Sequence, residues 1–207
     1  MTTASIVLAA GQSRRLGRPK QLILFRGRPL LQVVVDAVAA WPSESTVVVL
    51  GAHAEEILDA IDFGDAVVAI NEDWEEGIAS AIRVGFDILG RDSTRDRAFV
   101  ALGDQPEIPP DVPAQLLDAA EWSDRPAIVP VYRYERANPV LFDRRIWPRL
   151  MALEGDHGAS AFLKSHPELV EEVRVDHVPP HDVDTEEDAA ELGGDSRRPG
   201  PGSNSTR

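Results

Sequence analysis

Short apolar segments alternate along the chain with longer segments in which apolar residues recur at helical spacing. The short segments are rich in valine, isoleucine and alanine and have the length of β-strands: residues 6–10, 46–51, 66–70, 98–102, 127–132 and 172–177. The first four lack a polar–apolar alternation, which predicts parallel strands covered on both faces. The longer segments predict helices: residues 29–41, 54–61, 74–89 and 112–122. This order predicts an α/β fold of three layers with a mostly parallel central sheet.

Length and composition bound the kind of protein. The chain of 207 residues is long enough for one domain with a full core, which we place at residues 1–192. Residues 193–207 are mainly glycine, proline, serine and arginine, which predicts a disordered C-terminal tail. The absence of cysteine excludes disulfides, thiolate metal sites and a cysteine nucleophile. No signal peptide and no apolar stretch of membrane-spanning length is visible, so we expect a cytoplasmic protein that acts without a membrane.

The segment after the first predicted strand combines glycines with cations. Residues 8–20 read LAAGQSRRLGRPK and supply two glycines, a hydroxyl, three arginines and a lysine. Backbone N–H groups and cations in one loop suit a polyphosphate ligand. The spacing of Gly11, Gly17 and Lys20 fits neither the P-loop nor the dinucleotide fingerprint, so it indicates a different phosphate-binding architecture. The alternative is a set of solvated surface arginines after a strand.

The distribution of charge favours a small anionic ligand at this loop. The formal net charge of the chain is -14, yet residues 1–35 contain six basic residues and no acidic one. Cations concentrated at one place in an acidic protein focus positive potential there. The acidic remainder argues against a nucleic-acid partner, because duplex binding needs a broad basic face.

A carboxylate follows the predicted strand at residues 98–102. Asp104 lies just beyond Gly103, at the carboxyl end of that strand, where ligands bind in open α/β sheets. A carboxylate at this place can hold Mg²⁺, which prefers one or two carboxylates together with phosphate oxygens. The alternative is an ordinary aspartate at a turn.

Two further carboxylates lie near the end of the predicted domain. Asp182 and Asp184 are two residues apart, so they share a face of an extended segment, and either could complete a metal site with Asp104. Alternatively, Asp184 or Thr185 caps a last short helix, with Thr185 and Asp188 forming a capping box.

Three other segments carry polar or glycine-rich patterns. Asn71, Trp74, Gly77 and Ser80 lie where a strand passes into a predicted helix. Their amide and hydroxyl groups could read a nucleotide base, or the segment could be a helix cap with Trp74 as a core anchor.

The other two segments lie later in the chain. Residues 138–142 predict a stiff extended segment that lines an acceptor pocket or forms an edge strand. Residues 155–159 predict a glycine loop before a helix, which also suits phosphate.

These motifs occur together in one order: LAAGxSxRLGxxK at residues 8–20, NxxWxxGxxS at 71–80, LGDQP at 102–106, NP at 138–139, GDxGA at 155–159 and DxDT at 182–185. The set resembles the MobA/MocA-type nucleotidyltransferases that act on molybdenum cofactor, and it is most similar to their molybdenum cofactor cytidylyltransferase branch. The resemblance extends over nearly the whole chain, to about residue 192. It implies a Rossmann-like nucleotidyltransferase fold, Mg²⁺ dependence, and transfer of a nucleoside monophosphate to a phosphate acceptor with loss of pyrophosphate. The sequence Ala9-Ala10-Gly11 favours CTP, because relatives that use GTP usually read Ala-Gly-Gly there.

The resemblance also implies roles for individual residues. The residues expected to bind the nucleotide are Leu8, Ala9, Ala10, Gly11, Gln12, Ser13, Gly17, Asn71, Gly77 and Ser80. The catalytic residues would be Arg15, which neutralises the β- and γ-phosphates, Lys20, which bridges the α-phosphate and the acceptor, and Asp104. The metal ligands would be Asp104 with Asp182 or Asp184. The residues expected to bind the acceptor are Asn138, Pro139 and Gly158.

Three residues depart from the family pattern. Leu16 and Gln105 stand where methionine is common, and Ser160 stands where arginine is frequent, which leaves the identity of the acceptor open. Relatives of this fold also act on other phosphorylated acceptors, and some are nicotine-blue oxidoreductases that use a nicotinamide cofactor. The alternatives are therefore an NAD(P)-dependent oxidoreductase, a guanylyltransferase that uses GTP, and a non-catalytic carrier of molybdopterin. The expected partners are CTP or GTP, a phosphorylated acceptor such as molybdopterin, and a molybdoenzyme client.

Overall fold

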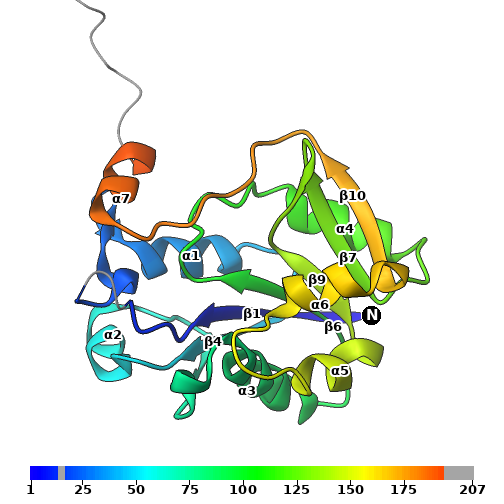
Figure 1. Ribbon diagram of the computed structural model, residues 1–207, viewed down its shortest axis with the longest axis horizontal. Coiled ribbons are helices and arrows are strands. Elements are labelled where there is room, and N and C mark those ends of the chain that lie inside the picture. The colour runs from blue at the N-terminus through cyan, green and yellow to red at the C-terminus, as the bar shows by residue number, and fades with distance from the viewer. Residues whose placement is uncertain (14–16, 194–207) are drawn as a thin grey trace, which may run out of the picture.

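A mixed sheet forms the centre of the molecule in the computed structural model, which describes residues 1–13 and 17–193 (Figure 1). Its strands are β1 (Thr2–Ala9), β4 (Ser45–Leu50), β5 (Val67–Ile70), β6 (Arg95–Leu102), β7 (Ala127–Tyr132), β8 (Glu135–Arg136), β9 (Val140–Asp143) and β10 (Val170–Val175). The order across the sheet is β10-β7-β9-β6-β1-β4-β5, and β8 pairs with β7. The pairs among β6, β1, β4 and β5 are parallel, as is the pair of β10 with β7, whereas β9 is antiparallel to both of its neighbours. The predicted α/β fold with a mostly parallel sheet is confirmed.

Helices cover both faces of the sheet. They are α1 (Leu30–Ala39), α2 (Ala54–Ala60), α3 (Ile78–Gly90), α4 (Val112–Ala120), α5 (Trp147–Met151), α6 (Ala159–Ser165) and α7 (Glu186–Gly193). Short 3-10 turns occur at Lys20–Leu22, Trp74–Glu76, Arg144–Ile146 and Pro167–Leu169. None of the helices in the described part of the chain is long and apolar enough to pass through a bilayer.

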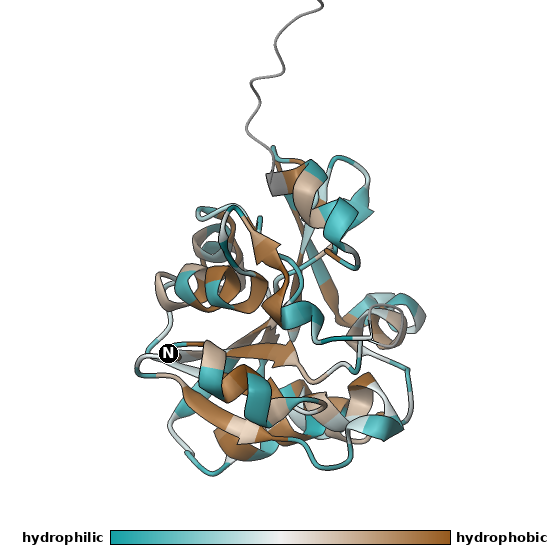
Figure 2. Cartoon of the chain, turned by 90° about the vertical axis from the view of Figure 1, so that its left-hand side faces the viewer, coloured by the Kyte–Doolittle hydropathy of each residue, from teal (hydrophilic) through white to brown (hydrophobic). Residues whose placement is uncertain are grey.

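Alternate residues of β1 enter two separate hydrophobic cores. Ile6 and Leu8 pack in the core formed with α3, α5 and α6, and Val7 and Ala9 pack in the core formed with α1, α2 and α4. Figure 2 shows the resulting pattern, with hydrophobic strands inside and hydrophilic residues on the outer surfaces of the helices. Because β1 is buried on both faces, its sequence shows a continuous apolar run rather than an alternation.

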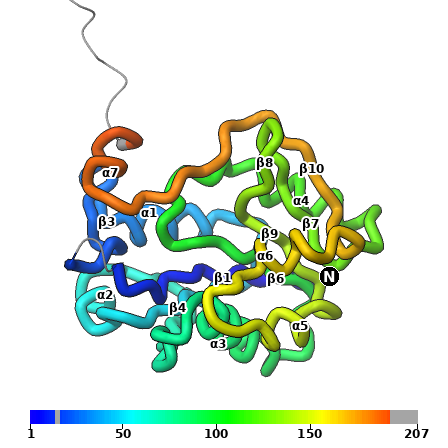
Figure 3. The backbone as a smooth tube through the Cα atoms, in the orientation of Figure 1, coloured from blue at the N-terminus to red at the C-terminus, as the bar shows by residue number. Residues whose placement is uncertain are grey.

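A third, smaller core joins the end of the described chain to its beginning. The hairpin of β2 (Leu24–Phe25) and β3 (Arg28–Pro29) packs with α7 around Phe25, Val183 and Ala189. Figure 3 shows α7 beside β3 and the start of α1, although these elements are far apart in the sequence. This contact brings the segment before α7 to the carboxyl ends of the central strands.

Two local predictions need correction. The helix predicted at residues 74–89 is divided into a 3-10 turn at Trp74–Glu76 and α3, because Gly77 between them has φ +100°. Residues 138–142 do not form an edge strand, since β9 lies inside the sheet between β6 and β7. The predicted tail lies outside the described residues from position 194 onward.

Candidate active site

A cavity of about 400 Å³ opens at the carboxyl ends of β1 and β6. Four groups of residues line it: the end of β1 with the loop and turn that follow, the turn before α3 with the start of α3, the end of β6 with the two residues after it, and Asp156 from the loop before α6. Its lining residues are Leu8, Ala9, Ala10, Gly11, Gln12, Ser13, Lys20, Gln21, Trp74, Glu75, Gly77, Ile78, Ala81, Leu102, Gly103, Asp104 and Asp156. The cavity therefore brings together the glycine-rich loop and Asp104. Lys20, at the end of that loop, is 84 residues before Asp104 in the sequence.

A buried glutamine holds the first part of the glycine-rich loop. The side chain of Gln21 is 2% exposed, and its amide nitrogen donates to the carbonyls of Ala9 (2.7 Å) and Gly11 (3.2 Å). Ser13 has φ +56°, and its hydroxyl accepts a hydrogen bond from the backbone N–H of Lys20 at 2.9 Å. These contacts curl the loop back on itself and direct Lys20 to the cavity. The role of Gln21 could not be predicted from the sequence, because its partners are backbone carbonyls.

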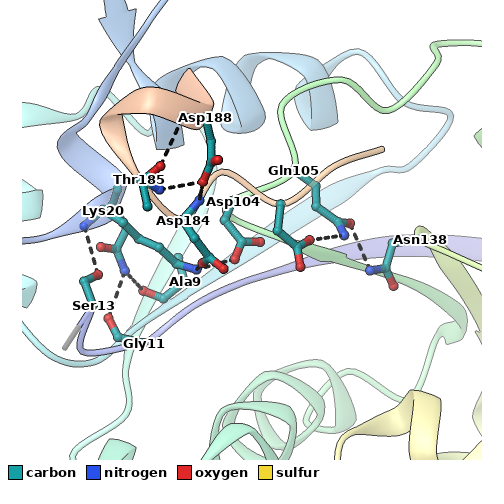
Figure 4. A network of polar contacts seen from close by, with 12 residues as sticks. Ala9, Gly11, Ser13, Lys20, Asp104, Gln105, Asn138, Asp184, Thr185 and Asp188 are labelled. Carbon is teal, nitrogen blue, oxygen red and sulfur yellow. Dashed lines mark hydrogen bonds and ion pairs between the residues drawn. The ribbon is translucent and has the colours of Figure 1, made fainter. Parts of the chain in front are cut away.

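Lys20 connects two carboxylates that are remote in the sequence (Figure 4). Its ammonium lies 2.5 Å from Oδ2 of Asp104 and 3.0 Å from Oδ1 of Asp184. Burial works to lower the pKa of Lys20, but the charges and hydrogen bonds of Asp104 and Asp184 outweigh it, so the pKa is raised above the ordinary 10.5. Lys20 is therefore a cation at neutral pH.

Asp104 is a buried carboxylate with spare hydrogen-bonding capacity. Its side chain is 15% exposed, and Oδ1 has no hydrogen-bond partner within the described part of the chain. Burial raises the pKa of Asp104 above 3.8, and the nearby Asp182 charge adds to this rise, whereas Lys20 opposes it. A buried, unpartnered carboxylate oxygen is costly unless a ligand or ion satisfies it.

Val183 places the two later carboxylates at this site. Its side chain is fully buried in the small third core, and its backbone N–H donates to the carbonyl of Asp104 at 2.9 Å. Asp182 and Asp184 flank Val183, so both project on the opposite side of the extended segment. Asp184 contacts Lys20, and Oδ1 of Asp182 accepts a hydrogen bond from the side chain of Gln105 at 2.7 Å.

The two readings of this acidic segment are compatible. Thr185 and Asp188 form the predicted capping box, with Thr185 N donating to Asp188 Oδ2 (2.8 Å) and Asp188 N donating to Thr185 Oγ1 (3.1 Å). Glu186, in the first turn of α7, forms an ion pair with Arg18 of the glycine-rich loop. The cap thus fixes the helix while Asp184 stays available to Lys20.

Asn71 and Ser80 support the cavity from behind. Each side chain is 1% exposed, the amide of Asn71 donates to the Ser80 hydroxyl at 2.8 Å, and that hydroxyl donates to the Gly77 carbonyl at 2.7 Å. Neither residue is among those that line the cavity. In this structure they fix the turn at Gly77, which is the helix-cap alternative, and their contact with a nucleotide stays a prediction. Trp74, which does line the cavity, also packs against the core.

Gly77 is in close contact with the loop at residues 155–158. A Cβ atom on Gly77 would lie 2.4 Å from Oδ1 of Asp156 and 2.7 Å from the backbone of Gly155. The Gly155 carbonyl also accepts a hydrogen bond from the N–H of Ala79 at 3.1 Å. This contact brings Asp156 into the cavity wall, a position that the sequence did not predict.

A second cavity of about 450 Å³ lies on the other side of Leu102, which lines both cavities. Gln105, Asn138 and Asp182 contribute amide and carboxylate groups to its lining, and Val140 and Phe142 are among its apolar lining residues. Two of the expected acceptor residues are not among its lining residues. Pro139 is buried, and Gly158 packs against Ile78 next to the first cavity.

Gly17, Arg15 and Leu16 remain of the residues singled out from the sequence. Gly17 has φ +66° and is not among the residues that line the first cavity. Arg15 and Leu16 lie outside the described residues. Within the described part of the chain, no three His, Cys, Asp or Glu side chains are arranged to hold a metal ion, and the Lys20 ammonium contacts both Asp104 and Asp184.

Comparisons with known proteins agree with this geometry. The model of the MobA-like NTP transferase domain matches residues 5–170. Nicotine blue oxidoreductase of Paenarthrobacter nicotinovorans is 31% identical over 194 residues, which cover 88% of this chain and 92% of that protein. The crystal structure of Rv0371c from Mycobacterium tuberculosis H37Rv has a TM-score of 0.83 at 30% identity, with 93% of this chain and 97% of that chain covered. Rv0371c in complex with manganese has a TM-score of 0.80 at 27% identity, with 93% and 98% covered. The chain therefore belongs to the MobA-like NTP transferase family of nucleotidyltransferases.

Proposed function

We propose that the protein transfers CMP from CTP to a phosphorylated acceptor, molybdopterin cofactor, and releases pyrophosphate in the presence of Mg²⁺. The main support for this proposal is the presence of two neighbouring cavities at the end of β6. Leu102 lines both, Asp104 lines the first, and the adjacent Gln105 lines the second. A transfer between two substrates needs this arrangement, with a nucleotide and an acceptor facing each other across one charged centre.

Two carboxylates at this centre suit Mg²⁺, because this ion commonly takes only one or two ligands from the protein and the others from substrate phosphates and water. Asp104 offers a buried oxygen that has no partner among the described residues, and Asp182 and Asp184 project from the segment before α7. Asp104 with Asp182 or Asp184 would hold Mg²⁺, which when bound neutralises phosphate charge and polarises the α-phosphate. The similar protein Rv0371c forms a complex with manganese, which supports the proposal that the present protein also uses a divalent ion.

The chain's own groups account for the rest of the reaction. Backbone N–H groups of residues 10–13 would hold the triphosphate, and Arg15 would neutralise the β- and γ-phosphates. Lys20, charged at neutral pH, would bridge the α-phosphate and the acceptor phosphate. An acceptor phosphate oxygen attacks the α-phosphorus, the bond to the bridging β-phosphate oxygen breaks, and pyrophosphate leaves with that electron pair. Catalysis then rests on positioning and on stabilising charge.

The acceptor would occupy the second cavity. Its apolar lining suits an organic ring system, and the amides of Gln105 and Asn138 suit a ring with hydrogen-bonding edges. We place the reaction in the cytoplasm, with a molybdoenzyme as the client that receives the product.

One relative favours a different chemistry. The similarity to nicotine blue oxidoreductase supports an NAD(P)-dependent oxidoreductase as the second candidate. That reaction would not need Asp104 as a metal ligand, so the two candidates differ in their dependence on a divalent ion.

The direct test of the transferase is to incubate the protein with Mg²⁺, molybdopterin and CTP labelled at the α-phosphate. We expect the label on the pterin and one pyrophosphate for each transfer. The same reaction with labelled GTP examines the preference for the base. Oxidation of NADPH without release of pyrophosphate would instead support the oxidoreductase.

A further inference from the structure

Gln105 lines the second cavity and directly follows Asp104, which lines the first, and both ends of its side-chain amide are engaged in hydrogen bonds. The side chain is 7% exposed. Its Nε2 donates to Oδ1 of Asp182 at 2.7 Å, and its Oε1 accepts from Nδ2 of Asn138 at 2.9 Å. Figure 4 shows Gln105 and Asn138 pointing toward one another.

The chemistry of the partners fixes the orientation of this amide. An ionised carboxylate only accepts hydrogen bonds, so Nε2 of Gln105 has to face Asp182. Its Oε1 must then face Asn138, whose own amide donates. Asn138 is held in turn, because its backbone carbonyl accepts a hydrogen bond at 2.9 Å from the hydroxyl of Tyr132, a fully buried residue. A chain of hydrogen bonds therefore runs from β7 through Gln105 to the segment before α7.

The two carboxylates on that segment have partners of different charge. Asp184 contacts the Lys20 ammonium, which compensates its charge. Asp182 contacts a neutral amide, which orients the carboxylate without neutralising it. The charge of Asp182 acts on Asp104 and contributes to the raised pKa of that group. Asp182 is thus oriented near Asp104 by a partner that carries no compensating charge.

We propose that Gln105 is a positioning residue, which holds the Asp182 carboxylate beside Asp104 for a divalent cation and links it through Asn138 to the acceptor cavity. This role rests on the proposed function, because it requires a cation at Asp104. Neighbours that orient a metal ligand typically change metal affinity by about 10- to 100-fold when they are removed. Gln105 therefore shapes the metal site without touching the metal.

The test is titration of the full chain with Mn²⁺ alone, followed by electron paramagnetic resonance of the free ion. Gln105→Met keeps the length of the side chain and removes both hydrogen bonds, and we expect it to weaken Mn²⁺ binding by about 10-fold. The matched control is Gln115→Met, because Gln115 also donates to an aspartate, Asp111, at 2.9 Å but lines neither cavity. We expect this control to bind Mn²⁺ like the wild type.

A double-mutant cycle separates positioning from a general structural effect. Asp182→Asn should weaken Mn²⁺ binding, and adding Gln105→Met to it should cause no further loss, because Gln105 acts through Asp182. Asn138→Ala, which removes only the far hydrogen bond, should cause a smaller loss and serves if Gln105→Met does not fold.

The outcomes distinguish this role from the proposed function. Absence of Mn²⁺ binding by the wild type would overturn the proposed function and this role with it. Tight binding by the wild type and equally tight binding by folded Gln105→Met would overturn the role of Gln105 alone. Additive losses in the cycle would also overturn it.

Discussion

The ammonium of Lys20 lies 2.5 Å from the Oδ2 atom of Asp104, and both residues line the cavity at the ends of β1 and β6. The turn that begins at Lys20 and the turn after β6 that carries Asp104 thus meet at one charged contact. The other carboxylate oxygen of Asp104 has no partner in the described part of the chain. This contact combines a cation for phosphate groups with an oxygen for a metal ion.

Removal of the Lys20 charge should reduce turnover without unfolding the protein. We expect Lys20→Ala to lower the rate of pyrophosphate release by about 10²-fold or more, because a positioned cation no longer meets the charge that develops in the transition state. Arg26→Ala is the control, since Arg26 pairs with Glu107 and lines neither cavity. A folded Lys20→Ala variant that turns over at the wild-type rate would remove Lys20 from the mechanism.

Asp104 should make the metal-free protein less stable as the pH rises. Burial raises its pKa in the folded state above the ordinary 3.8, so the folded state binds the proton more tightly than the unfolded state. Its contribution to stability is therefore largest at low pH and falls as the pH rises from about the unfolded value through the folded pKa. Asp104→Asn removes this dependence. We therefore expect the free energy of unfolding of the variant to increase relative to that of the wild type as the pH rises through this range.

Urea unfolding in the presence of a chelator, repeated across this pH range, measures the difference. A difference between Asp104→Asn and wild type that does not change with pH would contradict the raised pKa. The variant should also lose any stabilisation by Mn²⁺, which the wild type should retain.

Gly77 should not tolerate a side chain. Gly77→Ala combines a φ of +100° with a Cβ atom 2.7 Å from the backbone of Gly155, so we expect it to destabilise the fold by about 1–3 kcal/mol. The control is Gly90→Ala at the end of α3, where a Cβ would meet nothing within 4 Å. It should be neutral or stabilise by up to about 1 kcal/mol. Thermal unfolding of both variants is the measurement, and equal stability of the two would count against the strained turn.

The cap of α7 should control the local stability of the acidic segment. Thr185→Val removes the oxygen that accepts from Asp188 N–H, and we expect a loss of about 1 kcal/mol in the stability of this helix. Hydrogen exchange of the α7 amides should speed up relative to those of α6. Thr185→Ser keeps the hydroxyl and should exchange like the wild type, and equal exchange in Thr185→Val would argue against the cap.

The same helix should loosen in acid. Hydrogen bonds from Thr185 hold the pKa of Asp188 below 3.8, so its contribution to stability is present above the unfolded value and is lost as the pH falls through the lowered folded pKa. Exchange of the α7 amides should therefore accelerate selectively at the acid end of a pH series, and Asp188→Asn should show little of this change.

Much of the architecture could be predicted from the sequence because its physical cause is local. The continuous apolar run of β1 follows from burial on both faces, and the spacing of Asp182 and Asp184 places both on one side of the buried Val183. The inward position of β9 could not be predicted, since a short apolar strand shows the same pattern at an edge or between two neighbours. Nor could the role of Gln105, because its contact with Asp182 joins residues that are 77 positions apart and exists only in the folded chain.

The central claim is that the first cavity binds a nucleoside triphosphate together with a divalent ion. Thermal-shift measurements with CTP, GTP, ATP and NADPH, each with and without Mg²⁺, test it most directly. A ligand at 100 times its Kd should stabilise the protein by about 2.7 kcal/mol, which gives a clear shift in Tm. The account predicts a Mg²⁺-dependent shift that is larger with CTP than with GTP and that Lys20→Ala weakens. A shift with NADPH alone that is independent of metal would contradict it.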